Sequence, residues 1–340
     1  MSLSPRPSPK RRAAASALAI ASVLALSCGR PAAMGEANSL IVVAPDSLWT
    51  EVREATYATL EPTIFTTRED KKFVVTQVDP ASAEVSHLLL WRQVIVFGTP
   101  GDPLLERITD RAKGEAGSGI LQAADVWARG QLATAVVLEP GREAESWRER
   151  LPELERLIDA GYRTYVRSRM FVSGVDSALA GTLAERLGVT LRVPKVYRTV
   201  FRDPDIALIR NDNPDPSELI RSILLQVVPG ADSLTPEALY AWRESVDGEQ
   251  YNVPQRIGRN GPPPRRFSLD GREALEVAGT WADESDFPAA GPFFVRAVRC
   301  GERTVFADAW LYSPSPRRSK YEYLIQLEEI LDSLRCTSGT

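Results

Sequence analysis

The amino-acid sequence predicts an α+β protein with mixed or antiparallel sheets and helices packed against them. Short apolar runs recur along the chain, as buried strands require, and they alternate irregularly with stretches of helical periodicity. With 340 residues, of which 44% are hydrophobic and 25% charged, the chain has the composition of a globular protein and the length of one large or two ordinary domains.

The N-terminus has the order of parts of an export signal. Residues 1–12 are polar and basic, residues 13–26 form an uncharged apolar run, and Ser27 and Cys28 follow. The apolar run is shorter than the roughly 20 residues of a membrane-spanning helix. We therefore expect residues 1–27 to be a lipoprotein signal peptide and Cys28 to become the lipid-carrying N-terminus, which makes a membrane the first expected partner.

An ordinary signal peptide, cut within residues 22–34 with Cys28 left unmodified, is the alternative. No aspartate follows Cys28 as a retention signal, so we expect an outer-membrane lipoprotein that faces the periplasm. Residues 28–37 are small or polar and are expected to be a tether.

We expect two α+β halves behind the tether, residues 38–188 and 189–336. In the first half, Asp46 is expected to cap a helix, Gly188 to end another, and Pro152 to break or kink a third. The expected strands are 40–44, 73–78, 88–97 and 133–138. Besides the helix that Asp46 caps, the expected helices are 104–108, 142–171 with Pro152 inside it, and 176–187 ending at Gly188.

In the second half, Thr235 and Pro236 predict a helix start. The expected strands are 189–193, 206–209, 223–228 and 274–281, followed by a hairpin of 293–298 with 304–312. The expected helices are 235–246 and 319–334, and residues 256–267 are expected to be a loop. Residues 94–108 and 206–220 share the order strand, turn, Asp-Pro and apolar pair, which would fit two similar halves; chance likeness between turns fits as well.

Cys300 and Cys336 are the cysteines that remain beyond Cys28. An oxidising compartment would favour a disulfide between them. Two free thiols are the alternative, because spacing in sequence does not show proximity.

The charge and the motifs exclude several function classes. Removal of residues 1–27, which carry four basic side chains and no acidic one, lowers the formal charge from −4 to −8, so nucleic acid is not an expected partner. The chain has one histidine, His87, and lacks a phosphate-binding glycine loop and the common hydrolase motifs. We assign no catalytic residue, cofactor or metal ligand; Asp203–Asp205 and Asp212–Asp215 could offer oxygens to calcium, but turn capping explains them better.

Several short motifs occur together in the C-terminal half, and others precede them in order. The motifs are Gly279-Thr280-Trp281, Ala290-Gly291-Pro292-Phe293, Tyr312-Ser313-Pro314, Lys320-Tyr321, Arg243-Glu244 near Tyr251, Pro194 with Tyr197, and Arg92. In these the sequence resembles the bacterial lipoprotein family called domain of unknown function 4837. The resemblance implies a lipid-anchored envelope protein and no established activity.

The first functional hypothesis is a non-catalytic envelope lipoprotein that binds another envelope protein or a glycan. Its candidate binding surface combines an arginine, an aromatic side chain and a rigid strand entry: Arg92, Trp281, Gly291, Pro292 and Phe293. The alternative is a carboxylate-based hydrolase of envelope glycans, which requires two acidic side chains in one cleft.

Overall fold

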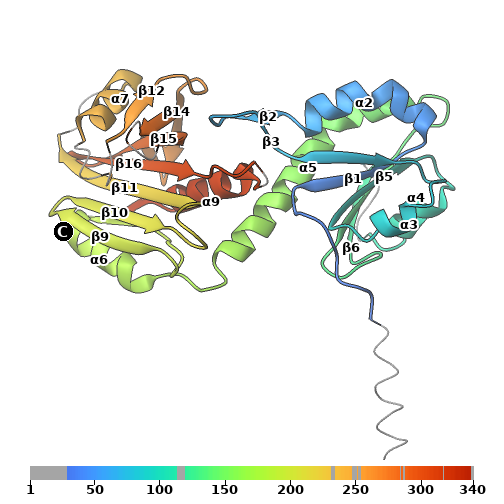
Figure 1. Ribbon diagram of the computed structural model, residues 1–340, viewed down its shortest axis with the longest axis horizontal. Helices are drawn as coiled ribbons and strands as arrows, with labels where there is room; N and C mark the ends of the chain where they lie inside the picture. Colours follow the sequence, from blue (N-terminus) through green and yellow to red (C-terminus); the bar gives the residue numbers. More distant parts are fainter. Residues whose placement is uncertain are drawn as a thin grey trace, which may run out of the picture. The chain divides into compact units, whose positions relative to one another are not determined.

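The computed structural model describes residues 29–112, 119–230, 234–246, 251, 254–283, 285, 288–316 and 318–337. The expected signal peptide and Cys28 lie outside these residues. The chain divides into two compact units (Figure 1): residues up to Val52 with Thr76–Arg150 form the first, and Arg53–Val75 with Leu151–Thr340 form the second. In the described residues, no helix has the length and apolarity needed to cross a bilayer.

The first unit is built on a mixed five-stranded sheet in the order β4-β1-β5-β7-β6. The strands are β1 (Ser39–Val43), β4 (Val74–Val78), β5 (Gln93–Gly98), β6 (Ile120–Ala124) and β7 (Leu132–Val137). Strands β1, β5 and β7 are parallel, and β6 is antiparallel to β7. The parallel strands are buried on both faces, which explains their continuous apolar runs.

Helices cover both faces of this sheet. Helices α3 (Val85–Leu88) and α4 (Pro103–Thr109) pack on the face that carries Val94 and Val96. On the other face, Phe97 stacks on Trp147, with ring centroids 4.1 Å apart. Trp147 belongs to α5 (Glu143–Met170), and α2 (Asp46–Leu60) follows β1. The expected strand 88–97 is therefore the end of α3, a turn and β5, and His87 lies in α3.

Residues 32–34 do not form the free tether that we expected. The amide of Ala33 donates to the carbonyl of Arg129 at 2.8 Å, and the amide of Met34 donates to the carbonyl of Leu90 at 3.0 Å. Gly35 has φ +79°, and a Cβ there would lie 2.1 Å from Nε1 of Trp91. Backbone pairing and this close approach hold the segment on the first unit.

The second unit is built on an antiparallel sheet of eight strands in the described chain. Seven follow the order β12-β14-β15-β16-β11-β10-β9, and β13 also pairs with β14. The strands are β9 (Arg198–Asp203), β10 (Ile206–Asn211), β11 (Ile220–Pro229), β12 (Arg256–Gly258), β13 (Arg265–Leu269), β14 (Arg272–Asp283), β15 (Ala289–Cys300) and β16 (Arg303–Tyr312). Part of the expected loop 256–267 is thus strand. Two short pairs complete the unit: β2 (Thr63–Ile64) with β3 (Asp70–Lys71), and β8 (Val189–Thr190) with β17 (Arg335–Cys336).

Helices lie on both faces of this sheet (Figure 1). Helices α6 (Ser177–Leu187) and α9 (Lys320–Asp332) pack on one face, and α7 (Pro236–Ser245) packs on the other. The boundary expected at residue 188 is therefore wrong, because α6 buries Leu179, Leu183 and Leu187 against the second unit's sheet. The two units are also not similar halves: segment 94–108 leads from a strand into α4, whereas 206–220 leads from β10 into β11.

Of the break or kink expected at Pro152, the break does not occur, because α5 continues through this residue. Leu151, Leu154 and Ile158 surround the proline and are buried. Proline inside a helix costs about 3 kcal/mol, and burial of a full Leu or Ile side chain contributes about 1.5–3 kcal/mol. Packing of three such side chains outweighs the penalty.

Cys300 and Cys336 form a disulfide, with Cα atoms 5.6 Å apart. The bond joins the end of β15 to β17, after the closing helix α9. It ties the central hairpin of the sheet to the C-terminal segment.

Candidate functional site

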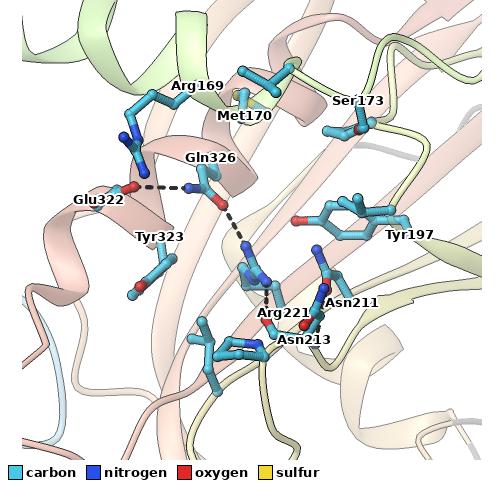
Figure 2. A pocket seen from close by; sticks show the side chains of 15 residues that line it. Arg169, Met170, Ser173, Tyr197, Asn211, Asn213, Arg221, Glu322, Tyr323 and Gln326 are labelled. Atoms are coloured by element: carbon cyan, nitrogen blue, oxygen red, sulfur yellow. Dashed lines mark hydrogen bonds between the residues drawn. The ribbon is translucent and has the colours of Figure 1, made fainter.

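The second unit contains an open pocket of about 340 Å³ at one end of its sheet. The end of α5, the loop after it, the segment before β9, the turn between β10 and β11, and the start of α9 line it (Figure 2). We call it the Arg221 pocket. Its polar lining comes from Arg169, Ser173, Tyr197, Asn211, Asn213, Arg221, Glu322, Tyr323 and Gln326.

Arg221 is a buried cation in this pocket and is only 8% exposed. It lies at the start of β11, where the strand registers it between Asn211 of β10 and Leu311 of β16. Its Nη1 donates to Oε1 of Gln326 at 2.8 Å, and its Nη2 donates to the carbonyl of Asn213 at 2.7 Å (Figure 2). Within the described residues, its Nε has no hydrogen-bond partner.

Tyr197 supplies a second buried polar atom without a hydrogen-bond partner in the described chain, its hydroxyl oxygen. The side chain is 6% exposed, and burial raises the pKa of Tyr197 to about 12, so the hydroxyl keeps its proton. The guanidinium carbon of Arg221 lies 5.9 Å from the centre of the Tyr197 ring and 5.3 Å from that of Tyr323. These aromatic faces stabilise the buried cation without neutralising it.

Part of the rim of the pocket is apolar. Val172 is 84% exposed and Val196 is 45% exposed, and both line the pocket together with Met170, Pro194, Pro214 and Leu219. The one carboxylate among the lining residues is Glu322, whose Oε1 accepts from Gln326 at 3.4 Å. The pocket therefore combines the buried cation Arg221 with exposed apolar side chains at its entrance.

The sequence-predicted surface residues lie elsewhere. Arg92 belongs to the first unit, where its backbone amide donates to the carbonyl of Met34 at 2.8 Å. The other four, Trp281, Gly291, Pro292 and Phe293, lie in the second unit. Trp281 of β14 is in register with Gly291 of β15.

These four residues are buried, so they do not offer the exposed surface that we expected. Trp281 donates from Nε1 to the carbonyl of Leu311 at 3.2 Å. A Cβ at Gly291 would lie 1.8 Å from that same carbonyl oxygen. Close packing between β14, β15 and β16 thus accounts for the glycine and the tryptophan.

A carboxylate-based hydrolase would need an acidic side chain with a raised pKa. Asp308 is such a side chain, but it is enclosed inside the second unit. Burial raises the pKa of Asp308, while Arg243 opposes this with its Nε 2.9 Å from Oδ2. Arg243 also lies 4.0 Å from the centre of the Phe293 ring. Because Asp308 has no exposed surface, it cannot reach a glycan.

Among the aspartates considered for calcium, Asp215 acts as a turn residue. Asp215 accepts hydrogen bonds from the amide and hydroxyl of Ser217 at 2.8 and 2.7 Å, and these bonds lower the pKa of Asp215. In the described part of the chain, no group of three or more acidic, histidine or cysteine side chains could hold a metal ion.

The Arg221 pocket is not among the surfaces that the sequence predicts. Its lining residues come from segments between 169 and 326, so no local motif marks it. One signal was available: Arg221 is the one charged residue within the apolar run from Leu219 to Val228, where a buried strand would normally exclude charge.

The family model described as domain of unknown function DUF4837 matches residues 176–333. The matched span includes Tyr197, Arg221 and the part of α9 that lines the pocket, whereas Arg169 and Ser173 precede it. No curated protein matches the chain.

Several solved structures show limited similarity. The Ran-binding protein Mog1p of Saccharomyces cerevisiae is 13% identical, with 44% of this chain and 90% of that chain covered and a TM-score of 0.31. The cyanobacterial PsbP of Synechocystis sp. PCC 6803 is 10% identical, with 44% and 86% covered and a TM-score of 0.31. LpqN of Mycobacterium tuberculosis, described as involved in cell envelope biogenesis, is 16% identical, with 44% and 83% covered and a TM-score of 0.28.

Proposed function

On the premise that residues 176–333 belong to the DUF4837 family, we propose that the protein is a non-catalytic binding protein of the bacterial cell envelope. Its second unit holds a small molecule in the Arg221 pocket, and a lipid on Cys28 anchors the chain to the outer membrane. The observation that carries the binding function is that the buried cation Arg221 lines an open pocket, and in the described chain its hydrogen bonds go to an amide oxygen and a carbonyl rather than to a carboxylate.

A buried charge is costly unless a counter-charge stabilises it. A ligand that brings an acceptor to the guanidinium of Arg221 would lower that cost. A volume of about 340 Å³ suits a small ligand rather than a polymer chain.

A glycan hydrolase receives no support from this geometry. Cleavage by carboxylates needs two acidic groups facing each other across the substrate. The lining residues of the Arg221 pocket include one, Glu322. We therefore assign the pocket to binding.

Closing the mouth of the pocket should abolish binding. Ser173 lies at the rim and is exposed (Figure 2), so Ser173→Trp places an indole over the entrance, and Ser173→Ala serves as the matched control. Native mass spectrometry of protein purified gently from its own envelope should show a small-molecule adduct on the wild type and on Ser173→Ala. The adduct should be lost in Ser173→Trp; a wild type without an adduct, or an equal adduct on all three, would refute the binding function.

The lipid anchor is supported by the basic and apolar leader before Cys28 and by the paired segment that follows. The carbonyls of Pro31 and Arg30 already accept hydrogen bonds from Arg129, at 2.8 Å from its amide and 3.1 Å from its Nε, which leaves Gly29 between Cys28 and the folded unit. One extended residue spans about 3.5 Å. The anchor would therefore hold the first unit close to the lipid head groups.

Intact mass measurement of the mature protein tests the anchor. We expect a chain that starts at Cys28 and carries acyl groups, found with the outer membrane. Cys28→Ser should accumulate with its leader attached, because the lipid acceptor is missing. An unacylated mature chain released to the periplasm would refute the anchor and leave the pocket unaffected.

A further inference from the structure

We infer that the ligand of the Arg221 pocket is an amphiphilic monoanion, which places a carboxylate on Arg221 and an apolar body against Val172 and Val196. The inference names the ligand class of the proposed binding function and rests on that function. Three features carry it: the charge of the lining residues, the free donors of Arg221, and the apolar rim.

The charge of the lining favours one negative charge on the ligand. The pocket is lined by two arginines, Arg169 and Arg221, and one glutamate, Glu322, which leaves one net positive charge. Arg221 forms no ion pair with a carboxylate in the described chain, because its hydrogen bonds go to Gln326 and to the carbonyl of Asn213. A buried charge is stabilised by a counter-charge, and the ligand would supply it.

The donors of Arg221 fit a carboxylate. A guanidinium has five N–H groups in a planar fork that matches the two oxygens of a carboxylate. Two of these groups serve Gln326 and Asn213, so donors remain for a ligand. The Tyr197 hydroxyl keeps its proton, so it adds no second charge to the pocket. A phosphate dianion would demand more positive charge than the lining provides.

The rim favours an apolar body beside the charged group. Five large apolar side chains of the described chain are exposed, and two of them, Val172 and Val196, line this pocket. Met170, Pro194 and Leu219 continue the apolar wall inward. Covering these surfaces contributes about 25 cal/mol per Å² of apolar area, so a ligand with a hydrocarbon portion binds better than a bare anion.

Calorimetric titration of the mature full-length chain tests each part with simple probes. Octanoate carries both features, octanamide keeps the chain without the charge, acetate keeps the charge without the chain, and octyl phosphate exchanges the anionic group. All are used below their micelle-forming concentrations. We expect octanoate to bind about 10-fold or more tightly than each of the other three.

Three variants locate the site. Arg221→Gln should weaken octanoate binding by about 10- to 100-fold, which corresponds to about 1.4–2.8 kcal/mol, and should leave octanamide binding within about 3-fold of its wild-type value. Tyr197→Phe removes the hydroxyl and keeps the ring, and we expect about a 5-fold loss. Arg265→Gln, at an exposed arginine of β13 that does not line the pocket, should change nothing. Circular dichroism and thermal melting check that each variant is folded.

The outcomes separate this inference from the binding function. Equal binding of octanoate and octanamide, or tighter binding of octyl phosphate, overturns the carboxylate assignment while the binding function stands. Equal binding of acetate and octanoate overturns the apolar body. If no probe binds but the wild type carries an adduct that Ser173→Trp loses, the ligand class is wrong and the pocket still binds. If no probe binds and the wild type carries no adduct, the two proposals fall together.

Discussion

Replacing Arg243 by methionine should lower the free energy of unfolding of the second unit by about 3–5 kcal/mol. Arg243 and Asp308 are both enclosed, with side chains 1% and 0% exposed and their Nε and Oδ2 atoms 2.9 Å apart. Methionine removes the cation, so Asp308 stays buried without a counter-charge. Urea denaturation followed by circular dichroism measures the loss.

Two further variants show whether the loss belongs to the buried pair. Arg259→Gln breaks an exposed ion pair with Glu244, whose side chains are 47% and 46% exposed, and should cost less than about 1 kcal/mol. The double variant Arg243→Met with Asp308→Leu removes both charges and should recover at least half of the loss. The prediction fails if Arg243→Met costs no more than Arg259→Gln.

The same variant should make stability depend on pH. Burial already raises the pKa of Asp308, and Arg243 opposes that rise, so its removal raises the pKa further. The folded variant then keeps a proton on Asp308 that the unfolded chain loses above its usual pKa of about 3.9. Stability therefore falls as pH rises above about 4 until the folded pKa is reached, by up to about 1.4 kcal/mol per unit. We expect a larger deficit against wild type at pH 8 than at pH 5.

Elements that depend on local chemistry could be predicted from the sequence. Helix α6 is an example: Asp176 accepts from the amide of Leu179 at 2.9 Å, and Gly188 ends the helix with φ +66°. Thr235 likewise caps α7 by accepting from the amide of Ala238 at 3.1 Å. In both helices the chemistry of the terminal residue itself, a capping side chain or a glycine that adopts positive φ, fixes where the helix begins or ends.

Some elements carry no apolar pattern and could not be predicted. Strand β9 (Arg198–Asp203) is mostly exposed and polar, so it lacks the apolar signature of a strand; hydrogen bonds to β10 define it. Strand β13 (Arg265–Leu269) pairs with β14 across the two-residue turn Asp270-Gly271, whose φ values of 55° and 74° are typical of a hairpin, so the sequence did contain a local signal for it. The pairing of Ala32 with Arg129 joins residues that no local pattern connects.

The candidate site shows the same limit. Trp281 and Phe293 drew attention because large aromatic side chains near a Gly-Pro turn can form a recognition surface, yet they fill the interior of the sheet. Arg221 carries the stronger chemical signal, because a buried strand normally excludes an arginine. The sequence does not show that Tyr197 and Gln326, from distant segments, lie beside Arg221 and line the same pocket.

Removing the disulfide should cost about 4 kcal/mol of stability. Cys300 and Cys336 are 36 residues apart in sequence, and closing a loop of that length restricts the unfolded chain by about that amount in the chain-entropy treatment. Cys300 belongs to the core beneath α9, whereas Cys336 pairs with Val189 between β17 and β8. Cys300→Ala with Cys336→Ala therefore frees the C-terminal segment from the central hairpin.

Urea denaturation of the oxidised wild type, the reduced wild type and the double alanine variant measures this cost. Reduction keeps both sulfur atoms in place, so agreement of the last two proteins within about 1 kcal/mol would assign the loss to the cross-link rather than to lost packing of the buried Cys300 side chain. A thiol assay on the unfolded, unreduced protein should find neither cysteine reactive. Two reactive thiols at these positions would show that the bond does not form, and the reduced and untreated proteins would then unfold at the same urea concentration.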